Sequence, residues 1–242
     1  QFHHNRVDRF FDDSIYLTPL TPGCLDQVHV YQNLFTRCFL PWGFGGFSEP
    51  GGPIYLYRNI VDMRVGTISS HGKFLNAAPL VVHFRSREAT NLGKLFIYQN
   101  TFITKVNPRL SRTLTADILR SYAQATLMFT RKDAPRRVHN NLYVYLEGMI
   151  PPAVESLPPL DEDVRIDGNM HWDTTNPQQS AKKFAAFRKS EFFRQSQKKY
   201  PPGWEARSRL GDPKFVKFSS DPWASNDYRI QRGSAATGAG IV

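Results

Sequence analysis

Residues 180–199 read SAKKFAAFRKSEFFRQSQKK, and their length and composition predict a helix. Pro177 lies close before this stretch, and the sequence Tyr-Pro-Pro-Gly at 200–203 ends it, because proline cannot continue a helix. On a helical wheel of about 100° per residue, Phe187 falls on one side with several alanines, while Phe193 points nearly opposite. We therefore expect a helix near 179–199 with aromatic side chains on both faces.

The charge of this helix indicates the kind of partner it would meet. Its basic residues are Lys182, Lys183, Arg188, Lys189, Arg194, Lys198 and Lys199. Against these seven cations stands one acid, Glu191, a balance that favours a phosphate backbone or an acidic protein surface as the neighbour. A half-buried surface helix with a solvated basic face would show the same pattern.

The composition of the whole chain points in the same direction. The 242 residues carry 31 basic and 21 acidic side chains, a formal net charge of +10, and 40% apolar residues, enough for a substantial core. Aromatic residues make up 13% and there are 17 prolines, both above the usual share. Together they predict extended segments anchored by rings on a partner surface.

Several classes of protein are not indicated by the sequence. Cys24 and Cys38 have no zinc-ligand spacing and suggest two reduced thiols, so neither a metal nor another cofactor is expected. No apolar run approaches the roughly 18 residues that span a bilayer. The chain starts at Gln1 and its first methionine is Met63, so we expect that an upstream segment was cleaved, trimmed or left out.

The fold class predicted is α+β, with a β-rich core sheet, one packed helix and an extended C-terminal tail that contains the basic amphipathic helix. The expected divisions are an N-terminal arm at 1–24, a core domain at 25–152 and a tail at 153–242. The clearest strand is 54–68, where apolar and polar residues alternate. The packed helix is expected at 116–125, after an N-cap at Thr115. Further strands are expected within 25–42, at 80–84 and at 95–106.

A second basic feature lies near the end of the core. Residues 127–131 and 142–146 predict two strands of a hairpin. The connection between them carries Arg131, Lys132, Arg136 and Arg137. A basic loop on a hairpin can enter a groove of a nucleic acid, although charged hairpin tips are also common without such a role.

The tail changes character twice. Residues 155–173 hold six acids against one arginine, immediately before the basic helix. Beyond the helix, aromatic residues recur among proline, glycine and serine. Disordered segments are usually poor in aromatic residues, so this segment is expected to be ordered by a partner. The aromatic residues expected to anchor the chain on a partner are Phe184, Phe187, Phe193, Trp204 and Trp223.

No common catalytic motif is present, so we expect a protein that is not an enzyme. The basic charge and long anchored segments favour a non-catalytic structural subunit of a large organellar assembly, foremost a mitochondrial ribosomal protein that contacts rRNA and its neighbours on the matrix side. One alternative is a peripheral accessory subunit of a mitochondrial respiratory complex or ATP synthase, which would meet acidic protein surfaces. Another is a viral capsid protein.

Overall fold

The computed structural model describes residues 1–10, 14–17, 26–38, 41–44, 52–64, 83–84, 94–104, 135–146 and 163–240. Within this part of the chain, two sheets of short parallel strands dominate the fold. The first sheet pairs, in order, β1 (Phe2–His3), β4 (Val28–Tyr31), β7 (Ile54–Tyr57), β10 (Leu95–Tyr98), β12 (Arg136–His139) and β14 (Val164–Asp167). The second sheet pairs, in order, β16 (Arg209–Leu210), β15 (Met170–Asp173), β13 (Leu142–Tyr145), β11 (Thr101–Thr104), β8 (Ile60–Met63), β5 (Leu34–Thr36) and β2 (Arg6–Asp8). A smaller parallel sheet contains β3 (Tyr16–Leu17), β6 (Gly43–Phe44) and β9 (His83–Phe84).

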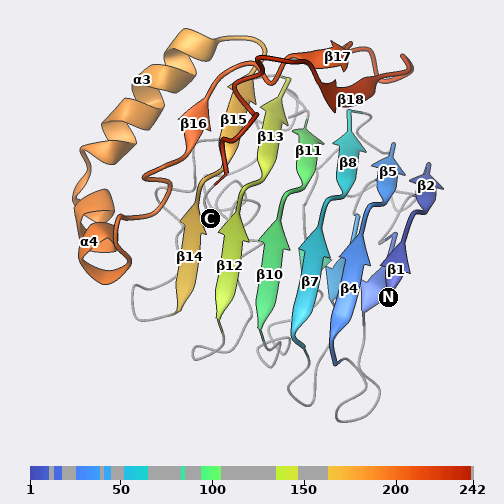
Figure 1. The fold of residues 1–242 in the computed structure, drawn as a ribbon, viewed down its shortest axis with the longest axis horizontal. Helices are drawn as coiled ribbons and strands as arrows, with labels where there is room; N and C mark the ends of the chain where they lie inside the picture. The colour runs from blue at the N-terminus through green and yellow to red at the C-terminus, as the bar shows by residue number, and fades with distance from the viewer. Residues whose placement is uncertain are drawn as a thin grey trace, which may run out of the picture.

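Strands of the first and second sheets alternate along the chain, which therefore winds as a solenoid. β7, for example, ends at Tyr57, and β8 begins in the other sheet at Ile60. Each strand pairs in parallel with its counterpart in the next coil, as β7 does with β10 and β8 with β11. Figure 1 shows the strands of the two sheets in end-to-end pairs, with the N-terminal strands at one end and the helices at the other.

A two-residue corner joins the two sheets in each coil. Its first residue has a positive φ, as in Arg58 (56°) and Gln99 (55°), and this left-handed conformation turns the chain from one sheet into the other. The same conformation is found at His4, Gln32, Arg58, Gln99, Asn140 and Gly168. The second corner residue is asparagine every time.

These asparagines form a hydrogen-bonded ladder along the solenoid. Its rungs are Asn5, Asn33, Asn59, Asn100, Asn141 and Asn169. Each side-chain Nδ2 donates to the Oδ1 of the next rung over 2.9 to 3.2 Å. The backbone N–H of the same residue donates to the same oxygen, so the ladder satisfies the buried polar groups of every corner. At its last rung, Asn169 donates to the Oε1 of Glu205 over 3.1 Å.

The core lies between the sheets. Rows of inward residues continue from coil to coil, such as Val30, Leu56 and Ile97 in the first sheet. In the second sheet Phe35, Val61 and Phe102 form the corresponding row, and all six side chains are buried. Stacking therefore gives each apolar side chain a similar neighbour above and below, which is how repeat folds build a continuous core.

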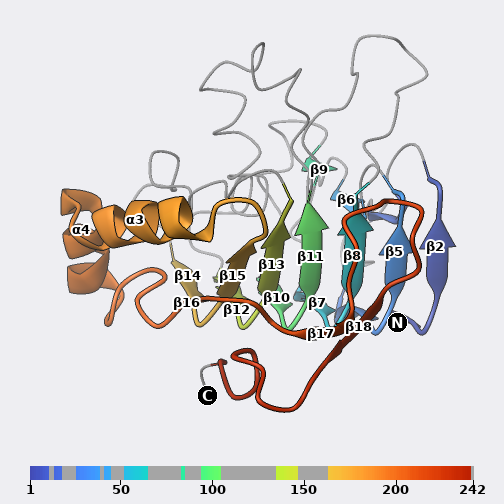
Figure 2. The same cartoon turned by 90° about the horizontal axis from the view of Figure 1, so that it is seen from above.

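Two short helices close the C-terminal end of the solenoid. α3 (Pro177–Arg188) and α4 (Glu191–Lys199) are separated by a break at which the Ser190 hydroxyl accepts a hydrogen bond from the Phe193 N–H (3.1 Å). α3 packs on β15, with the Phe184 ring 5.6 Å from the ring of His171. The helices thus bury their aromatic side chains against the last coil and leave their charged face outward, as a terminal cap of a repeat fold requires (Figures 1 and 2).

The C-terminal segment covers part of the outer face of the second sheet. β17 (Phe215–Lys217) and β18 (Asp227–Ile230) pair antiparallel on this face, as Figure 2 shows. Phe215 packs with the outward side chains Ile103 and Val144 in a second apolar cluster. This cluster fastens the segment to the coils from β11 onward.

The structure confirms the α+β class and the β-rich core. It differs within the elements: the predicted strand 54–68 is divided by the corner at Arg58 and Asn59, and the predicted helix near 179–199 is two helices. The break lets α4 change direction, so that Phe193 is buried beside Phe187 (5.5 Å between ring centroids) instead of lying on an opposite face.

The structure also differs from the predicted hairpin and from the predicted start of the tail. β13 pairs in parallel with β11 and β15, so residues 142–145 belong to the solenoid; the predicted hairpin partner 127–131 and the predicted helix 116–125 lie outside the described residues. β14 and β15 continue both sheets into the region predicted as an extended tail from residue 153. Their inward side chains, such as Ile166, complete the apolar rows, which explains why this segment is not extended on its own.

Candidate functional site

A groove runs between the N-terminal strands of the second sheet and the C-terminal segment. Its floor is the outer face of β2, β5 and β8, its wall is residues 222–229, and its volume is about 510 Å³. The floor side chains are Arg6, Leu34, Thr36, Arg37, Ile60, Asp62 and Arg64. Strand pairing alone places these residues side by side, because each lies at or near the same level of adjacent coils.

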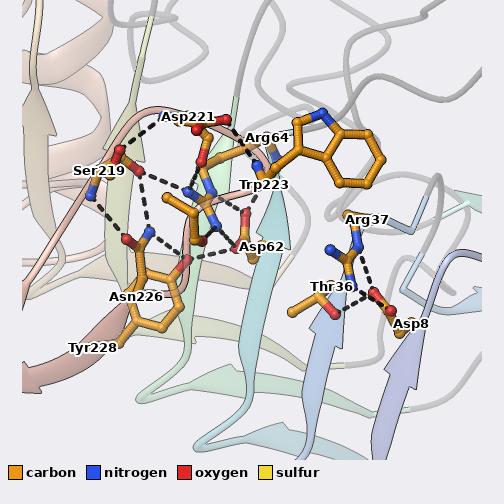
Figure 3. Close-up of polar contacts among 11 residues, drawn as sticks. Asp8, Thr36, Arg37, Asp62, Arg64, Ser219, Asp221, Trp223, Asn226 and Tyr228 are labelled. Carbon is orange, nitrogen blue, oxygen red and sulfur yellow. Dashed lines mark hydrogen bonds and ion pairs between the residues drawn. The ribbon is translucent and has the colours of Figure 1, made fainter.

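A buried ion pair fixes the wall of the groove to its floor. Arg64 pairs with Asp62 over 2.7 Å, and both side chains are 5% exposed. The guanidinium of Arg64 also donates to the backbone carbonyls of Ser219 (2.7 Å) and Asp221 (Figure 3). It donates to the carbonyl of Ala224 as well, over 3.2 Å. If the wall moved away, the buried guanidinium of Arg64 would lose these acceptors, which is costly for a buried charge. The contacts of Arg64 therefore hold the wall in place.

Tyr228 adds a second connection from the wall to Asp62. Its hydroxyl donates to Asp62 Oδ2 over 2.6 Å and accepts a hydrogen bond from the amide of Asn226 (3.2 Å). Burial and the neighbouring Asp62 carboxylate raise the pKa of Tyr228, so the hydroxyl stays protonated and continues to donate. The wall is therefore a rigid part of the fold.

Trp223 projects from this wall. Its side chain is 64% exposed, the largest value among the exposed large apolar side chains of the described residues. The guanidinium carbons of Arg9 and Arg37 lie 5.7 and 5.4 Å from its ring. Figure 3 shows the indole on the outer side of the Asp62 and Arg64 pair, near Arg37. The groove thus presents a fixed aromatic ring to solvent.

Polar groups around the ring are held in charge pairs. Arg37 Nε donates to Asp8 Oδ1 over 2.7 Å, and Arg229 Nε donates to Asp227 Oδ1 over 2.9 Å. The hydrogen bond from Arg37 holds the pKa of Asp8 below its ordinary value, and the hydrogen bond from Arg229 does the same for Asp227. Both carboxylates therefore remain ionised at neutral pH and act as acceptors in fixed positions.

The basic residues predicted on the helix are all exposed, but they differ in their freedom. Arg188 donates to the carbonyls of Glu205 (3.1 Å) and Ser208 (2.7 Å), and Arg194 pairs with Glu191 over 2.8 Å. Lys199 lies 5.5 Å from the ring of Tyr200. Among the residues that the structure describes, no ion pair involves Lys182, Lys183, Lys189 or Lys198.

The second basic feature is dispersed in the structure. Arg136 and Arg137 lie on β12, while Arg131 and Lys132 fall outside the described residues. Arg136 is 1% exposed, and burial lowers its pKa to about 10; Arg137 pairs with Asp163 over 2.9 Å. A side chain that points inward cannot contact a partner, so the prediction of a basic surface is corrected at Arg136.

The aromatic anchors also need a correction. Phe184, Phe187, Phe193 and Trp204 are between 1% and 7% exposed. They fill the space between the helical cap and the last coil, because the open end of the solenoid core would otherwise be wet. Trp223 alone of the five predicted anchors is free to contact another molecule.

The chain has no significant match among protein-family models, curated proteins or solved structures. Among the described residues, no group of three or more histidine, cysteine, aspartate or glutamate side chains is arranged to hold a metal ion. Across the same residues, no helix has both the length and the apolar character to span a membrane. The proposals below therefore rest on the geometry alone.

Sequence reasoning found Trp223 but missed the residues that surround it. Asp8, Thr36 and Asp62 are neighbours only because β2, β5 and β8 stack. Tyr228 meets Asp62 across 166 positions of the sequence. The signal that could have revealed the groove is the recurring asparagine of the corners, since it fixes which residues of each coil share a level.

Proposed function

We propose that the chain is a non-catalytic binding protein that holds a sugar residue of a polysaccharide on Trp223. The observation that carries this proposal is the 64% exposed indole, fixed in a groove whose lining includes arginines paired with carboxylates, among them Arg64 with Asp62 and Arg229 with Asp227. Covering an exposed aromatic ring removes apolar surface from water, so a ligand that packs on the indole gains binding energy. The ring is therefore the expected centre of binding.

A sugar fits the two kinds of surface in this groove. Its C–H groups form an apolar face that can cover the indole, and its hydroxyl groups need both donors and acceptors, which arginine and aspartate pairs provide. Covering about half of a tryptophan side chain removes roughly 100 Å² from water and contributes about 2.5 kcal/mol. The remaining affinity would come from the hydroxyl contacts and from further sugars along the groove.

The charges favour this ligand over a phosphate backbone within the groove. Three of the four arginines that line the groove, Arg37, Arg64 and Arg229, already have a carboxylate partner, and Arg6 has none among the described residues. A phosphate would have to approach Asp8, Asp62 and Asp227 as well as the arginines, so the gain from counterion release would be small. An uncharged hydroxyl is attracted to both members of each pair.

The same pairs support binding without cleavage. Hydrolysis of a glycosidic bond usually needs one carboxyl group that stays protonated as a general acid and a second that is ionised. The pKa values of Asp8 and Asp227 are lowered by their arginines, the opposite of what a general acid requires.

The test uses affinity electrophoresis of the full chain in gels that contain single purified polysaccharides. Trp223→Ala should abolish the retardation that the unaltered protein shows in at least one gel, since loss of a central tryptophan costs about 2 kcal/mol or more. Val216→Ala is the matched control, because Val216 is 47% exposed on the same segment but does not line the groove. Retardation unaffected by Trp223→Ala, or absent in every gel, would refute the proposal.

A second candidate function rests on the four lysines of the helical cap that have no ion pair among the described residues, Lys182, Lys183, Lys189 and Lys198. We propose as the alternative that this face binds an anionic macromolecule, foremost rRNA in a mitochondrial ribosome, or else an acidic protein surface of another large assembly. Binding to RNA should weaken steeply with salt. Paired Lys182→Glu and Lys189→Glu substitutions should abolish it, whereas Trp223→Ala should not. Sedimentation with ribosomal RNA that is lost on nuclease treatment would distinguish this function from the first.

A further inference from the structure

A second hollow adjoins the Trp223 groove at the corner between the two sheets. It has a volume of about 400 Å³ and shares Arg6, Leu34 and Ile60 with the groove. On its far side lie the corner residues His4, Gln32 and Arg58. The two hollows meet along the three shared residues, and together they are called the depression, which extends from the Trp223 groove to the corner of the solenoid.

The two halves of this depression differ in charge. The Trp223 groove is lined by four arginines together with Asp62 and Asp227, whereas the lining of the corner hollow includes His4, Arg6 and Arg58 and no acid. Among the residues that the structure describes, no ion pair joins Arg6 or Arg58 to a carboxylate. Arg58 Nε donates to the neutral Gln99 Oε1 over 3.1 Å, which orients the guanidinium without neutralising it. The corner hollow is thus positively charged.

We infer that the corner hollow is an anion subsite, and that it takes a carboxylate or sulfate substituent of an acidic polysaccharide whose neighbouring sugar lies on Trp223. This inference rests on the proposed function and adds the charge of the ligand to it. An arginine with no acidic partner offers paired N–H donors that match both kinds of anion. At the corner the negative group would meet no carboxylate, whereas in the Trp223 groove it would lie near Asp62 and Asp227, so the corner is the favoured position and the depression sets the direction of the chain.

Three polymers that share one backbone provide the test: dextran, carboxymethyl-dextran and dextran sulfate. Binding to the full chain is measured by affinity electrophoresis at low and moderate salt. We expect both charged polymers to bind at least about tenfold more tightly than dextran, a difference of about 1.4 kcal/mol. The relative affinities of the two charged polymers tell whether carboxylate or sulfate is preferred.

Arg58→Gln is the decisive variant, because glutamine already occupies the same left-handed corner position at Gln32 and Gln99. It should remove the preference for charged polymers and leave the binding of dextran unchanged. Arg232→Gln is the matched control, since Arg232 is exposed outside both hollows. An equal loss in both variants would mean a general attraction to a basic protein and would overturn the inference. So would failure of both charged polymers to bind, or tighter, Arg58-dependent binding of a single-stranded RNA oligonucleotide.

The two proposals fail in different ways. If Trp223→Ala leaves all binding intact while Arg58→Gln still removes the charge preference, the anion subsite exists without the sugar platform. If Trp223→Ala abolishes binding while Arg58→Gln has no effect, the groove binds sugars and the corner hollow takes no part.

Discussion

Replacing Asn100 by alanine should destabilise the solenoid more than any exposed substitution. The Asn100 side chain is buried and donates to the carbonyls of Leu56 (2.9 Å) and Tyr98 (3.1 Å) and to Asn141 Oδ1 (3.0 Å). Its Oδ1 accepts from both the backbone N–H and the side-chain amide of Asn59, each over 3.0 Å. Alanine would remove all five bonds at once.

The magnitude follows from what remains unpaired. The backbone N–H of Asn59 would be buried with no acceptor, and one hydrogen of its side-chain amide would lose its partner. Each such donor costs about 1–3 kcal/mol, so for the two donors together the free energy of unfolding should fall by about 2–6 kcal/mol. The extra volume left by the shorter side chain adds to this cost in the same direction.

Urea unfolding followed by tryptophan fluorescence measures the effect, with an unchanged dependence on urea as the sign that the transition is still two-state. Asn5→Ala is the matched control, because Asn5 is an exposed end rung of the same ladder. It should cost less than about 1 kcal/mol. If the two variants lose the same stability, the buried rungs of the ladder do not hold the coils together.

Three other predictions concern the cap, the groove and the corners. Burial opposes ionisation of Glu205, but electrostatic attraction to the neighbouring His171 and hydrogen bonds from His171, Ser208 and Asn169 outweigh it and lower the pKa of Glu205 below 4.5. The stabilisation that ionised Glu205 contributes is therefore complete above about pH 4.5 and is lost as pH falls through the lower folded-state pKa. Glu205→Gln should make the free energy of unfolding, measured by denaturation, less dependent on pH in this acidic range. An unchanged pH dependence would contradict this. Arg64→Ala should speed amide exchange of residues 219–226 by at least about tenfold while exchange in α3 stays the same, and equal rates throughout would show that Arg64 does not hold the wall. At the corner residue Gln32 (φ 53°), valine should destabilise by about 1–2 kcal/mol relative to glycine in thermal melts, because a β-branched side chain is strained at positive φ, and equal melting temperatures would argue against strain.

The positions of many strands could be predicted from the sequence, because apolar and polar residues alternate within each strand. In β7 the inward residues are Ile54 and Leu56, and in β8 they are Val61 and Met63. The alternation therefore slips by one residue between Tyr57 and Ile60. A single period-2 pattern fitted across this slip gives one long strand, and that is why the corner was not predicted.

The repeat itself was hidden by its uneven length. Successive rungs of the ladder are separated by 28, 26, 41, 41 and 28 residues. A search for a fixed period fails on such spacing, although each corner ends in asparagine and most follow a tyrosine or histidine, as in residues 31–33 and 98–100 (both Tyr-Gln-Asn). The hydrogen bonds of the ladder constrain only the corner residues. The chain between corners can therefore vary in length without disturbing the stacking of the coils.

The position of the groove is set by the outward rows of the second sheet. One row runs through Asp8, Thr36, Asp62, Ile103, Val144 and Trp172 in consecutive coils. Its polar half lies where the groove opens, and its apolar half lies where Phe215 and Phe218 of the C-terminal segment cover the sheet. The change from polar to apolar falls between Asp62 and Ile103.

Asp62 lies at this boundary and, through its pair with Arg64, fixes the position of the C-terminal segment on the sheet. A buried ion pair adds little net stability compared with apolar side chains of similar size, because both charges must leave water. The Asp62 and Arg64 pair instead requires one arrangement of the wall, since Arg64 needs the carbonyls of residues 219, 221 and 224 as well as its carboxylate. An apolar pair could let the segment slide along the sheet, whereas this pair fixes it at the level that places Trp223 over the edge of the groove. The stacked coils provide the sheet, and the buried pair determines where on that sheet the proposed ligand would be held.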